Sequence, residues 1–265
     1  MDGPVVGIDF SGAEQAGHGI WLAEVDPEGQ GLRVTDCRSA ADRFGIADRT
    51  PCLGELCAYL SETPHTAGLD FSFGLPTAVH DRDDWDAFRR WFPTAFTDDE
   101  AMQDACVERA EAATDGEWTY APRTTDSPVG ASSPYHWLVA KQTFYGIRDV
   151  LAPLAGAVTV RPMETGDPPY LCEIYPKATL ASLDLPAQKY KDDDERAGER
   201  RRAIVEGLER ETSLTFAESV RNTLVSDAGG HALDSVVAAL AADRARRADF
   251  EPDREYDPVE GHIYV

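Results

Sequence analysis

The sequence predicts an α/β fold in which helices flank a mixed sheet, and three observations predict it. Short apolar segments of strand length alternate with longer segments of helical periodicity. Three strand segments come first, and a helix then leads to a further apolar strand. With 265 residues, of which 42% are hydrophobic, the chain can bury a substantial core. No interdomain linker or repeat interrupts the pattern, so we expect a single domain over residues 1–265.

The N-terminal segment predicts three antiparallel strands. Residues 5–10 are apolar except for Asp9 and are followed by a turn of small residues. Residues 19–25 and 32–37 have the composition of two further strands. Residues 26–31, which lie between these two, contain the Asp, Pro and Gly residues of a hairpin turn.

Residues 50–60 predict a helix that crosses the sheet. Thr50 and Pro51 suit an N-cap and a first-turn proline, and apolar residues then recur at helical spacing. Residues 67–73 form the next strand, which carries Asp70. Because such a crossover is right-handed and makes its two strands parallel neighbours, we expect Asp9 and Asp70 at the same end of adjacent strands.

Residues 81–126 are rich in acids and aromatics, and they predict a helical insertion after the fourth strand, over the edge or mouth of the site. Four aromatics recur there at helical spacing: Trp85, Phe88, Trp91 and Phe92. Such a stripe can stack a nucleobase, but it more often forms the core face of a helix, which is the interpretation we favour. A long helix over residues 135–154 and strands over residues 158–162 and 170–176 are predicted to follow.

Residues 192–202 form a charge run, for which a solvated helix face is the leading interpretation. Clustered basic residues lie directly before this run and at its end, so we expect a phosphate to contact Lys189, Lys191 and Arg201. After Gly229 and Gly230, an apolar helix is predicted from residue 231 to about residue 247. The apolar tail, residues 260–265, is expected to dock on the domain.

Four carboxylates stand in otherwise apolar segments: Asp9, Asp70, Glu173 and Asp234. Burying an ionised acid is unfavourable unless it is hydrogen-bonded or bound to a cation. Three of the acids have a structural alternative, since Asp9 or Asp70 can cap a loop amide and Asp234 can favour the helix dipole. Clustered carboxylates that hold two Mg²⁺ or Mn²⁺ ions about 3.5–4 Å apart form the arrangement that cleaves phosphodiesters. We therefore expect the four acids to form one divalent-metal site.

The charge is the most unusual bulk property of the chain. The formal net charge is -23, and only four of the 25 basic residues are lysines. An acidic surface with this preference for arginine predicts a halophilic protein, with an ordinary acidic cytosolic protein as the alternative. In molar salt the Debye length falls to about 3 Å, so the charge does not exclude a nucleic-acid substrate.

Other classes of site have little support. The six histidines show no HExxH spacing, which disfavours zinc, and no GxSxG or GxxxxGK[ST] motif supports a serine hydrolase or a Walker-type NTPase. The five cysteines contain no CxxC pair and are expected to be reduced. We expect a cytoplasmic protein with no membrane contact, because the sequence shows no leader and no apolar stretch of about 18 residues.

Six short motifs occur in order along the chain, at residues 7–9, 68–76, 173–176, 189–191, 231–235 and 260–263. Together they resemble the family named domain of unknown function 429 (DUF429), which is similar to the ribonuclease H-like superfamily. The resemblance implies a mixed five-stranded sheet with three antiparallel strands, a crossover helix and flanking helices. It also implies metal-binding roles for Asp9, Asp70 and Asp234, with Glu173 as an addition. The turn after Asp9 and the insertion at residues 81–126 depart from the family pattern.

The function expected from these residues is that of a metal-dependent nuclease or phosphodiesterase. Mg²⁺ or Mn²⁺ would be the cofactor, nucleic acid or a nucleotide the partner, and Glu173 either a ligand or the base for the attacking water. One alternative is an actin-like phosphoryl-transfer enzyme of the sugar-kinase or ATPase type, which also begins with a strand and an Asp. The other is a non-catalytic binding module that keeps the fold while its acids serve structure.

Overall fold

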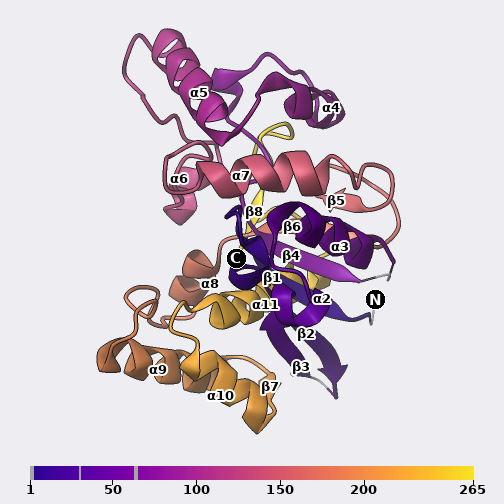
Figure 1. The fold of residues 1–265 in the computed structure, drawn as a ribbon, viewed down its shortest axis with the longest axis vertical. Coiled ribbons are helices and arrows are strands. Elements are labelled where there is room, and N and C mark those ends of the chain that lie inside the picture. The colour runs from indigo at the N-terminus through magenta and orange to yellow at the C-terminus, as the bar shows by residue number, and fades with distance from the viewer. Residues whose placement is uncertain (1–2, 30, 63–64) are drawn as a thin grey trace.

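The computed structural model describes residues 3–29, 31–62 and 65–265. Eight strands form one sheet (Figure 1): β1 (Val5–Asp9), β2 (Trp21–Glu28), β3 (Gly31–Ser39), β4 (Thr66–Asp70), β5 (Thr159–Arg161), β6 (Tyr170–Ile174), β7 (Leu214–Phe216) and β8 (Ile263–Tyr264). The α-helices are α1 (Ala16–Gly19), α2 (Ala40–Phe44), α3 (Arg49–Glu62), α4 (Trp85–Ala95), α5 (Asp99–Ala113), α6 (Asp126–Val129), α7 (Ala140–Gly146), α8 (Pro176–Ser182), α9 (Glu195–Glu211), α10 (Glu218–Ser226) and α11 (His231–Arg247). A 3₁₀ turn, η1 (Thr77–Val79), and a π-helical turn, η2 (Ile147–Leu151), complete the structure.

The sheet is mixed, as the sequence predicts. Its order is β5-β6-β4-β1-β2-β3-β7, with β8 paired to β6. The N-terminal strands β1, β2 and β3 are antiparallel neighbours, and β4 lies parallel to β1 after the crossover through α3, so both predictions are confirmed. The implied number of five strands is too low, because β5, β7 and β8 extend the sheet by short parallel pairings. The docking of β8 on β6 also confirms that the tail packs on the domain.

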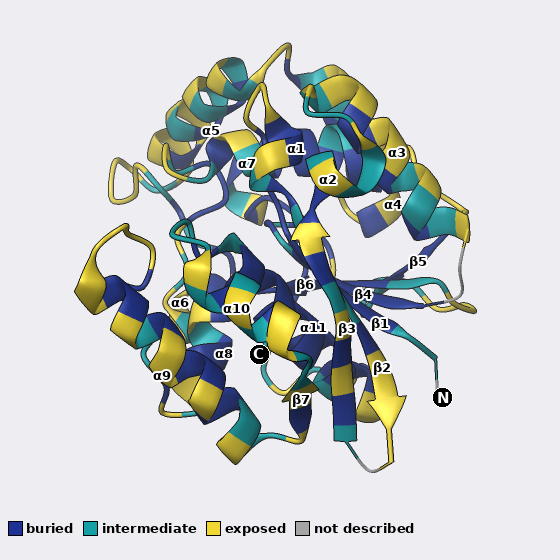
Figure 2. Cartoon of the chain, turned by 60° about the horizontal axis from the view of Figure 1, so that its bottom comes forward, coloured by how far each residue is buried: buried dark blue, intermediate teal, exposed yellow. Residues whose placement is uncertain are grey.

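Helices cover both faces of the sheet (Figure 2). On one face, α3 and α7 pack against Val6, Ile8 and Leu69. On the other face, α11 packs against Val5 and the strands next to it, and α8, α9 and α10 lie around α11. Side chains of β1 alternate between these two cores, as the period of two in a strand requires. All five cysteines are unpaired, and no helix of the described residues combines the length and the apolar character that a membrane span needs.

The insertion at residues 81–126 is helical; Arg123, near its end, lines a pocket with Asp70, while its two longer helices pack elsewhere. It contains α4 and α5, which pack on α7, η1 and η2, on the face of the sheet opposite α11 (Figure 1). Trp85, Phe88 and Phe92 are buried in the core, which confirms the core-face interpretation. Asp84 and Asp98 begin the two helices, and their side chains accept hydrogen bonds from Ala87 and Ala101.

Several predicted element boundaries differ from the observed ones. The helix expected to begin after Thr50 begins at Arg49. The helix expected over residues 135–154 is shorter, since α7 begins at Ala140 and changes into the π-helical turn η2. The charge run becomes the start of α9, where Asp194 is the N-cap. The last helix, α11, has the predicted limits.

Candidate metal centre

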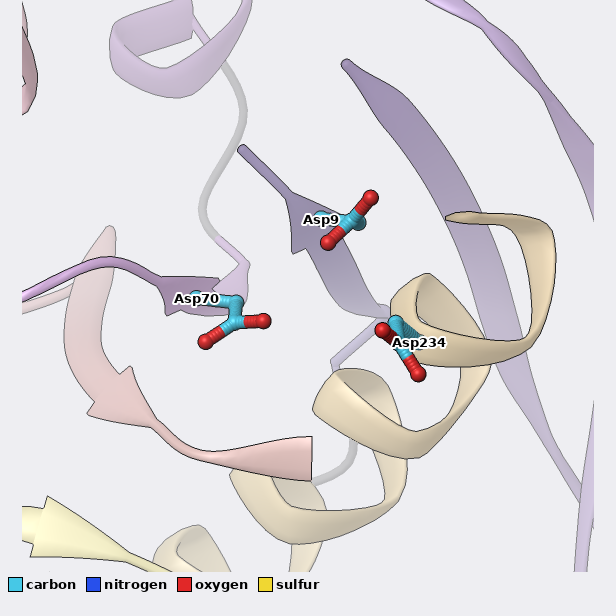
Figure 3. A group of neighbouring side chains, drawn as sticks. All are labelled: Asp9, Asp70 and Asp234. Atoms are coloured by element: carbon cyan, nitrogen blue, oxygen red, sulfur yellow. The ribbon is translucent and has the colours of Figure 1, made fainter. Parts of the chain in front are cut away.

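Strand register brings the first two carboxylates together. Asp9 and Asp70 are the last residues of β1 and β4, and they are register partners in this parallel pair. Val5 faces the α11 side of the sheet, so Gly7 and Asp9 face the same side by alternation. The same alternation places Gly68 and Asp70 on that side. Both acids therefore leave the sheet at one edge and on one face (Figure 3).

Two glycines allow α11 to approach this face closely. Gly7 and Gly68 are register partners on β1 and β4. A Cβ atom on Gly7 would lie 1.8 Å from the carbonyl oxygen of Ser235, and one on Gly68 would lie 2.7 Å from that of Ala238. The backbone of α11 thus rests directly on the two strands, a close approach that only glycine permits. This contact places Asp234, in the first turn of α11, opposite Asp9 and Asp70.

The three carboxylates are close enough to share a cation. One oxygen from each lies within 4.8 Å of the others, and Asp9 and Asp234 are only 5% and 1% exposed. Opposite oxygen ligands of one Mg²⁺ are about 4.2 Å apart, so small side-chain rotations would bring all three onto one ion. The same three carboxylates would hold either one or two divalent ions. The predicted convergence of Asp9, Asp70 and Asp234 is therefore present.

Neighbouring side chains hold two of the three acids in place. The Oδ2 atom of Asp9 lies 2.7 Å from Nδ1 of His231. The hydroxyl of Tyr190 donates a hydrogen bond of 2.6 Å to Oδ1 of Asp234, and the ammonium of Lys191 forms an ion pair with Oδ2 of the same residue. Among the described residues, none donates a hydrogen bond to the carboxylate of Asp70 or pairs with it. The set thus includes one carboxylate left without a partner.

Protonation equilibria reflect this crowding. Burial raises the pKa of Asp9 from 3.8 to about 6; the hydrogen bond with His231 opposes the rise, and the charge of Asp234 adds to it. Burial and the charges of Asp9 and Asp234 raise the pKa of Asp70 well above 3.8. Burial disfavours the charged form of Lys191, but the three aspartates raise its pKa overall. A divalent cation would stabilise the ionised carboxylates in place of protons.

Glu173 does not join the cluster, and strand alternation explains why. Its register partner on β4 is Leu69, not Asp70, so its side chain lies on the opposite face of the sheet. Both of its oxygens accept hydrogen bonds from Arg123, and one also accepts the backbone N–H of Phe73 at 2.9 Å. Burial raises the pKa of Glu173, while the guanidinium of Arg123 opposes the rise. The geometry therefore gives Glu173 a partner other than a metal ion.

Arg123 is the centre of a buried polar network that the sequence did not reveal. Its side chain is 1% exposed and also donates to Asp126 at 2.8 Å. Glu260, next to it, accepts the backbone N–H groups of Thr77 and Thr124 at 2.7 and 2.8 Å. Segments after β4, before α6 and before β8 are thereby joined beneath the site. The position of Glu173 in the apolar β6 segment indicates that a cation lies near it, but the sequence does not identify that cation as Arg123.

The predicted phosphate contacts separate into two kinds. Lys189 is exposed, and Lys191 is half exposed while paired with Asp234. Arg201 is only 4% exposed and donates hydrogen bonds to the carbonyl oxygens of Tyr190 and Val225 at 2.7 and 2.8 Å. The predicted contact of Arg201 with a phosphate is therefore wrong, because its buried side chain instead supports the loop that carries the lysines.

His231 is a site residue that sequence reasoning underrated. In the sequence, a single histidine after two glycines is more readily explained as a helix-start residue than as a base. In the structure its hydrogen bond with Asp9 is the main cause of the raised pKa of His231. Its position just before Asp234 in the same helical turn is the signal that could have identified it.

Comparisons with known proteins support the family resemblance. A model of the family described as "Protein of unknown function (DUF429)" matches residues 7–256. The searches of curated proteins and of solved structures gave no match. The matched segment includes all three clustered aspartates and covers most of the chain. This chain therefore belongs to the DUF429 family.

Proposed function

We propose that this protein is a metal-dependent nuclease or phosphodiesterase of ribonuclease H-like architecture. The observation that carries the proposal is the convergence of Asp9, Asp70 and Asp234 at one edge of the sheet, within 4.8 Å of one another. Two strands and a helix supply these acids, as the ribonuclease H-like resemblance implies. The three antiparallel strands with β4 parallel to β1 are a second point of support.

The residues of the cluster fit Mg²⁺ or Mn²⁺. Both ions prefer oxygen ligands, and all three side chains are carboxylates. The carboxylate of Asp70, which no donor of the described chain contacts, is the position where a cation is most needed. Asp9, Asp70 and Asp234 would hold the ions, which when bound supply an activated water and stabilise the leaving oxygen of a phosphodiester.

The remaining side chains orient the ligands and bind substrate. His231 fixes the rotamer of Asp9, and Tyr190 fixes that of Asp234, as neighbours of metal ligands commonly do. Lys189 and Lys191 supply positive charge for a phosphate group. We expect the protein to act in the cytoplasm on nucleic acid or nucleotides, in a salt-rich environment that screens its charge of -23.

The two alternative functions make different predictions for the same residues. For the actin-like enzyme, Gly229 and Gly230 would contact a nucleotide. Gly230 has a φ of +71° at the N-cap of α11, so this glycine is also explained by the turn into the helix. For a binding module, the aspartates would be structural, and replacing one by asparagine would leave the biological role intact.

Calorimetric titration with Mn²⁺ in molar KCl tests the proposal. We expect the wild type to bind, Asp9→Asn to bind at least about tenfold more weakly, and Asp26→Asn, which changes an exposed acid on β2, to bind like the wild type. Hydrolysis of single-stranded, duplex, hybrid and branched nucleic acids and of bis(p-nitrophenyl) phosphate would then be compared. An absence of Mn²⁺ binding overturns the proposal, and stabilisation by ATP instead would support the actin-like alternative.

A further inference from the structure

A cavity of ≈ 390 Å³ lies beside the candidate metal centre. Asp70 and Asp234 form part of its wall, so it opens onto two of the three carboxylates. Tyr175 and Tyr190 also line the cavity. Sites for small molecules typically have volumes of about 300–1,000 Å³, and this cavity lies near the lower limit. Its size suits one nucleotide-sized group.

Lysine is rare in this chain but concentrated in this cavity. Of the four lysines in the sequence, Lys177, Lys189 and Lys191 line the cavity, which we call the three-lysine pocket. The fourth, Lys141, lies in α7 and its ammonium is 3.8 Å from a carboxylate oxygen of Asp99. An ammonium group is a compact charge that binds phosphate well. The concentration of three such groups next to a metal centre indicates an anionic ligand.

The loop that carries two of these lysines is fixed from behind. Arg201 donates to the carbonyl oxygen of Tyr190 at 2.7 Å, and Arg200 donates to that of Lys189 at 3.1 Å. Lys189 itself has a φ of +59°, in the left-handed region that disfavours residues other than glycine. The two arginines therefore hold the backbone of the loop that presents Lys189 and Lys191.

The net charge of the side chains that line the pocket differs in sign from that of the whole protein. When one divalent cation is bound, the three aspartates and the three lysines together carry a net positive charge. The complete chain carries -23. A small phosphate therefore meets an attractive pocket, whereas a long polyanion would also meet the acidic surface around it.

We propose that the three-lysine pocket binds the terminal phosphate monoester of a nucleotide-sized ligand, with Lys177 and Lys189 as its contacts. The ligand is either a free mononucleotide or the 5′-phosphorylated end of a short single strand, since both present the same group. The inference rests on the proposed function, because it places this phosphate next to the metal centre. It assigns a ligand role to Lys177, on α8.

The test measures binding of four probes by calorimetry in the presence of Mn²⁺. The probes are adenosine 5′-monophosphate, adenosine, and a pentanucleotide with and without a 5′-phosphate. Lys177→Gln and Lys189→Gln should each weaken binding of the phosphorylated probes by about tenfold, the value of one charge-assisted contact. Lys141→Gln is the matched control. Because Lys141 lies outside the pocket and distant sites rarely couple, this variant should bind the phosphorylated probes with an affinity within about twofold of the wild type. Glutamine at position 189 keeps the strained φ, so the variant should be as stable as the wild type.

The outcomes separate the two ligand sources and the two proposals. Preference for the monophosphate supports a free nucleotide, and preference for the phosphorylated pentanucleotide supports a chain end. Equal binding with and without the phosphate, or equal affinities of the three lysine variants, overturns the inference. The same probes are also titrated into metal-free Asp70→Asn, which lacks one negative charge at the pocket wall. If metal-free Asp70→Asn binds the phosphorylated probes more tightly than the unphosphorylated ones, the pocket is supported even when the wild type does not bind Mn²⁺. If neither the wild type nor Asp70→Asn prefers the phosphorylated probes while the wild type still binds Mn²⁺, the pocket is overturned and the metal centre is not.

Discussion

Replacing Asp9 by asparagine should stabilise the metal-free protein. Asp9 is 5% exposed and its pKa rises from 3.8 to about 6 on folding. At pH 8 the acid is ionised in both states, so the folded protein bears the cost of about 2 pKa units, or about 3 kcal/mol at 1.36 kcal/mol each. Asparagine does not ionise and therefore avoids this cost.

The expected increase in the free energy of unfolding of Asp9→Asn is smaller than this value of about 3 kcal/mol. The net pKa shift of Asp9 already includes its hydrogen bond with His231, but the amide group of asparagine must also be buried, which costs about 1 kcal/mol. We therefore expect Asp9→Asn to raise the free energy of unfolding by about 2 kcal/mol in EDTA at pH 8. For a protein of this size, that corresponds to about 4–8 °C in Tm.

The pH dependence has a defined sign. Because the folded pKa is the higher one, the folded wild type binds more protons than the unfolded chain between pH 3.8 and about 6. The stability of the wild type relative to Asp9→Asn is therefore retained below pH 3.8 and lost as the pH rises to about 6. The additional free energy of unfolding of Asp9→Asn over the wild type should reach its full value above about pH 6 and fall towards zero as the pH is lowered to 3.8.

Urea unfolding in EDTA and in Mn²⁺ is the assay. At a hundredfold excess of Mn²⁺ over Kd the wild type should gain about 2.7 kcal/mol, while Asp9→Asn gains much less. Asp26→Asn, at an exposed position, should follow the wild type in both buffers. If Asp9→Asn is less stable than the wild type in EDTA at pH 8, Asp9 has a structural role and the reasoning is refuted.

Four further predictions follow from features around the site. Gly7→Ala should lower Tm by more than about 10 °C, because its Cβ would overlap the backbone of α11. Gly54→Ala, the control, has open space around it and should raise the free energy of unfolding by about 0.5–1 kcal/mol. Equal Tm values for the two variants would show that α11 does not rest on β1. Arg123→Met should cost about 3–5 kcal/mol in urea unfolding, since it leaves two buried carboxylates without their cation, and a loss below 1 kcal/mol would contradict the network. Lys191→Gln should raise the affinity for Mn²⁺ several-fold in calorimetry, because its ammonium competes with a cation for one aspartate, and an unchanged affinity would exclude competition. Raising KCl from about 0.1 to 2 M should raise Tm through screening of the net charge of -23, and a constant Tm would argue against adaptation to salt.

The cluster could be predicted because its three acids depend on local patterns. Asp9 and Asp70 each follow a short apolar strand, and the handedness of crossovers then sets their strands side by side. Asp234 lies in an apolar helix whose limits were predicted correctly. The alanines of that helix favour a close approach to the sheet, but nothing local in the sequence indicates that Gly7 and Gly68 face it.

Other features depend on register and long-range contacts, which a single sequence does not contain. Glu173 was grouped with the aspartates because its segment is apolar, but a shift of one residue in register sends it to the other face of the sheet. Arg123 lies in a loop-like segment, so nothing local indicates that it is buried. The strand β7 has three residues and the strand β8 has two, and such short strands carry too little alternation to be recognised.

The seating of α11 on Gly7 and Gly68 divides the site into a fixed part and a variable part. The three aspartates belong to elements in backbone contact, so the tight packing of α11 on β1 and β4 fixes the positions of their backbones. Lys189 and Lys191 stand on a loop outside that contact. Substitutions in the loop can therefore alter which anion is selected while the chemistry of the carboxylates is preserved. If the cluster has the proposed function, this arrangement would let one metal centre acquire new substrates through substitutions in a single segment.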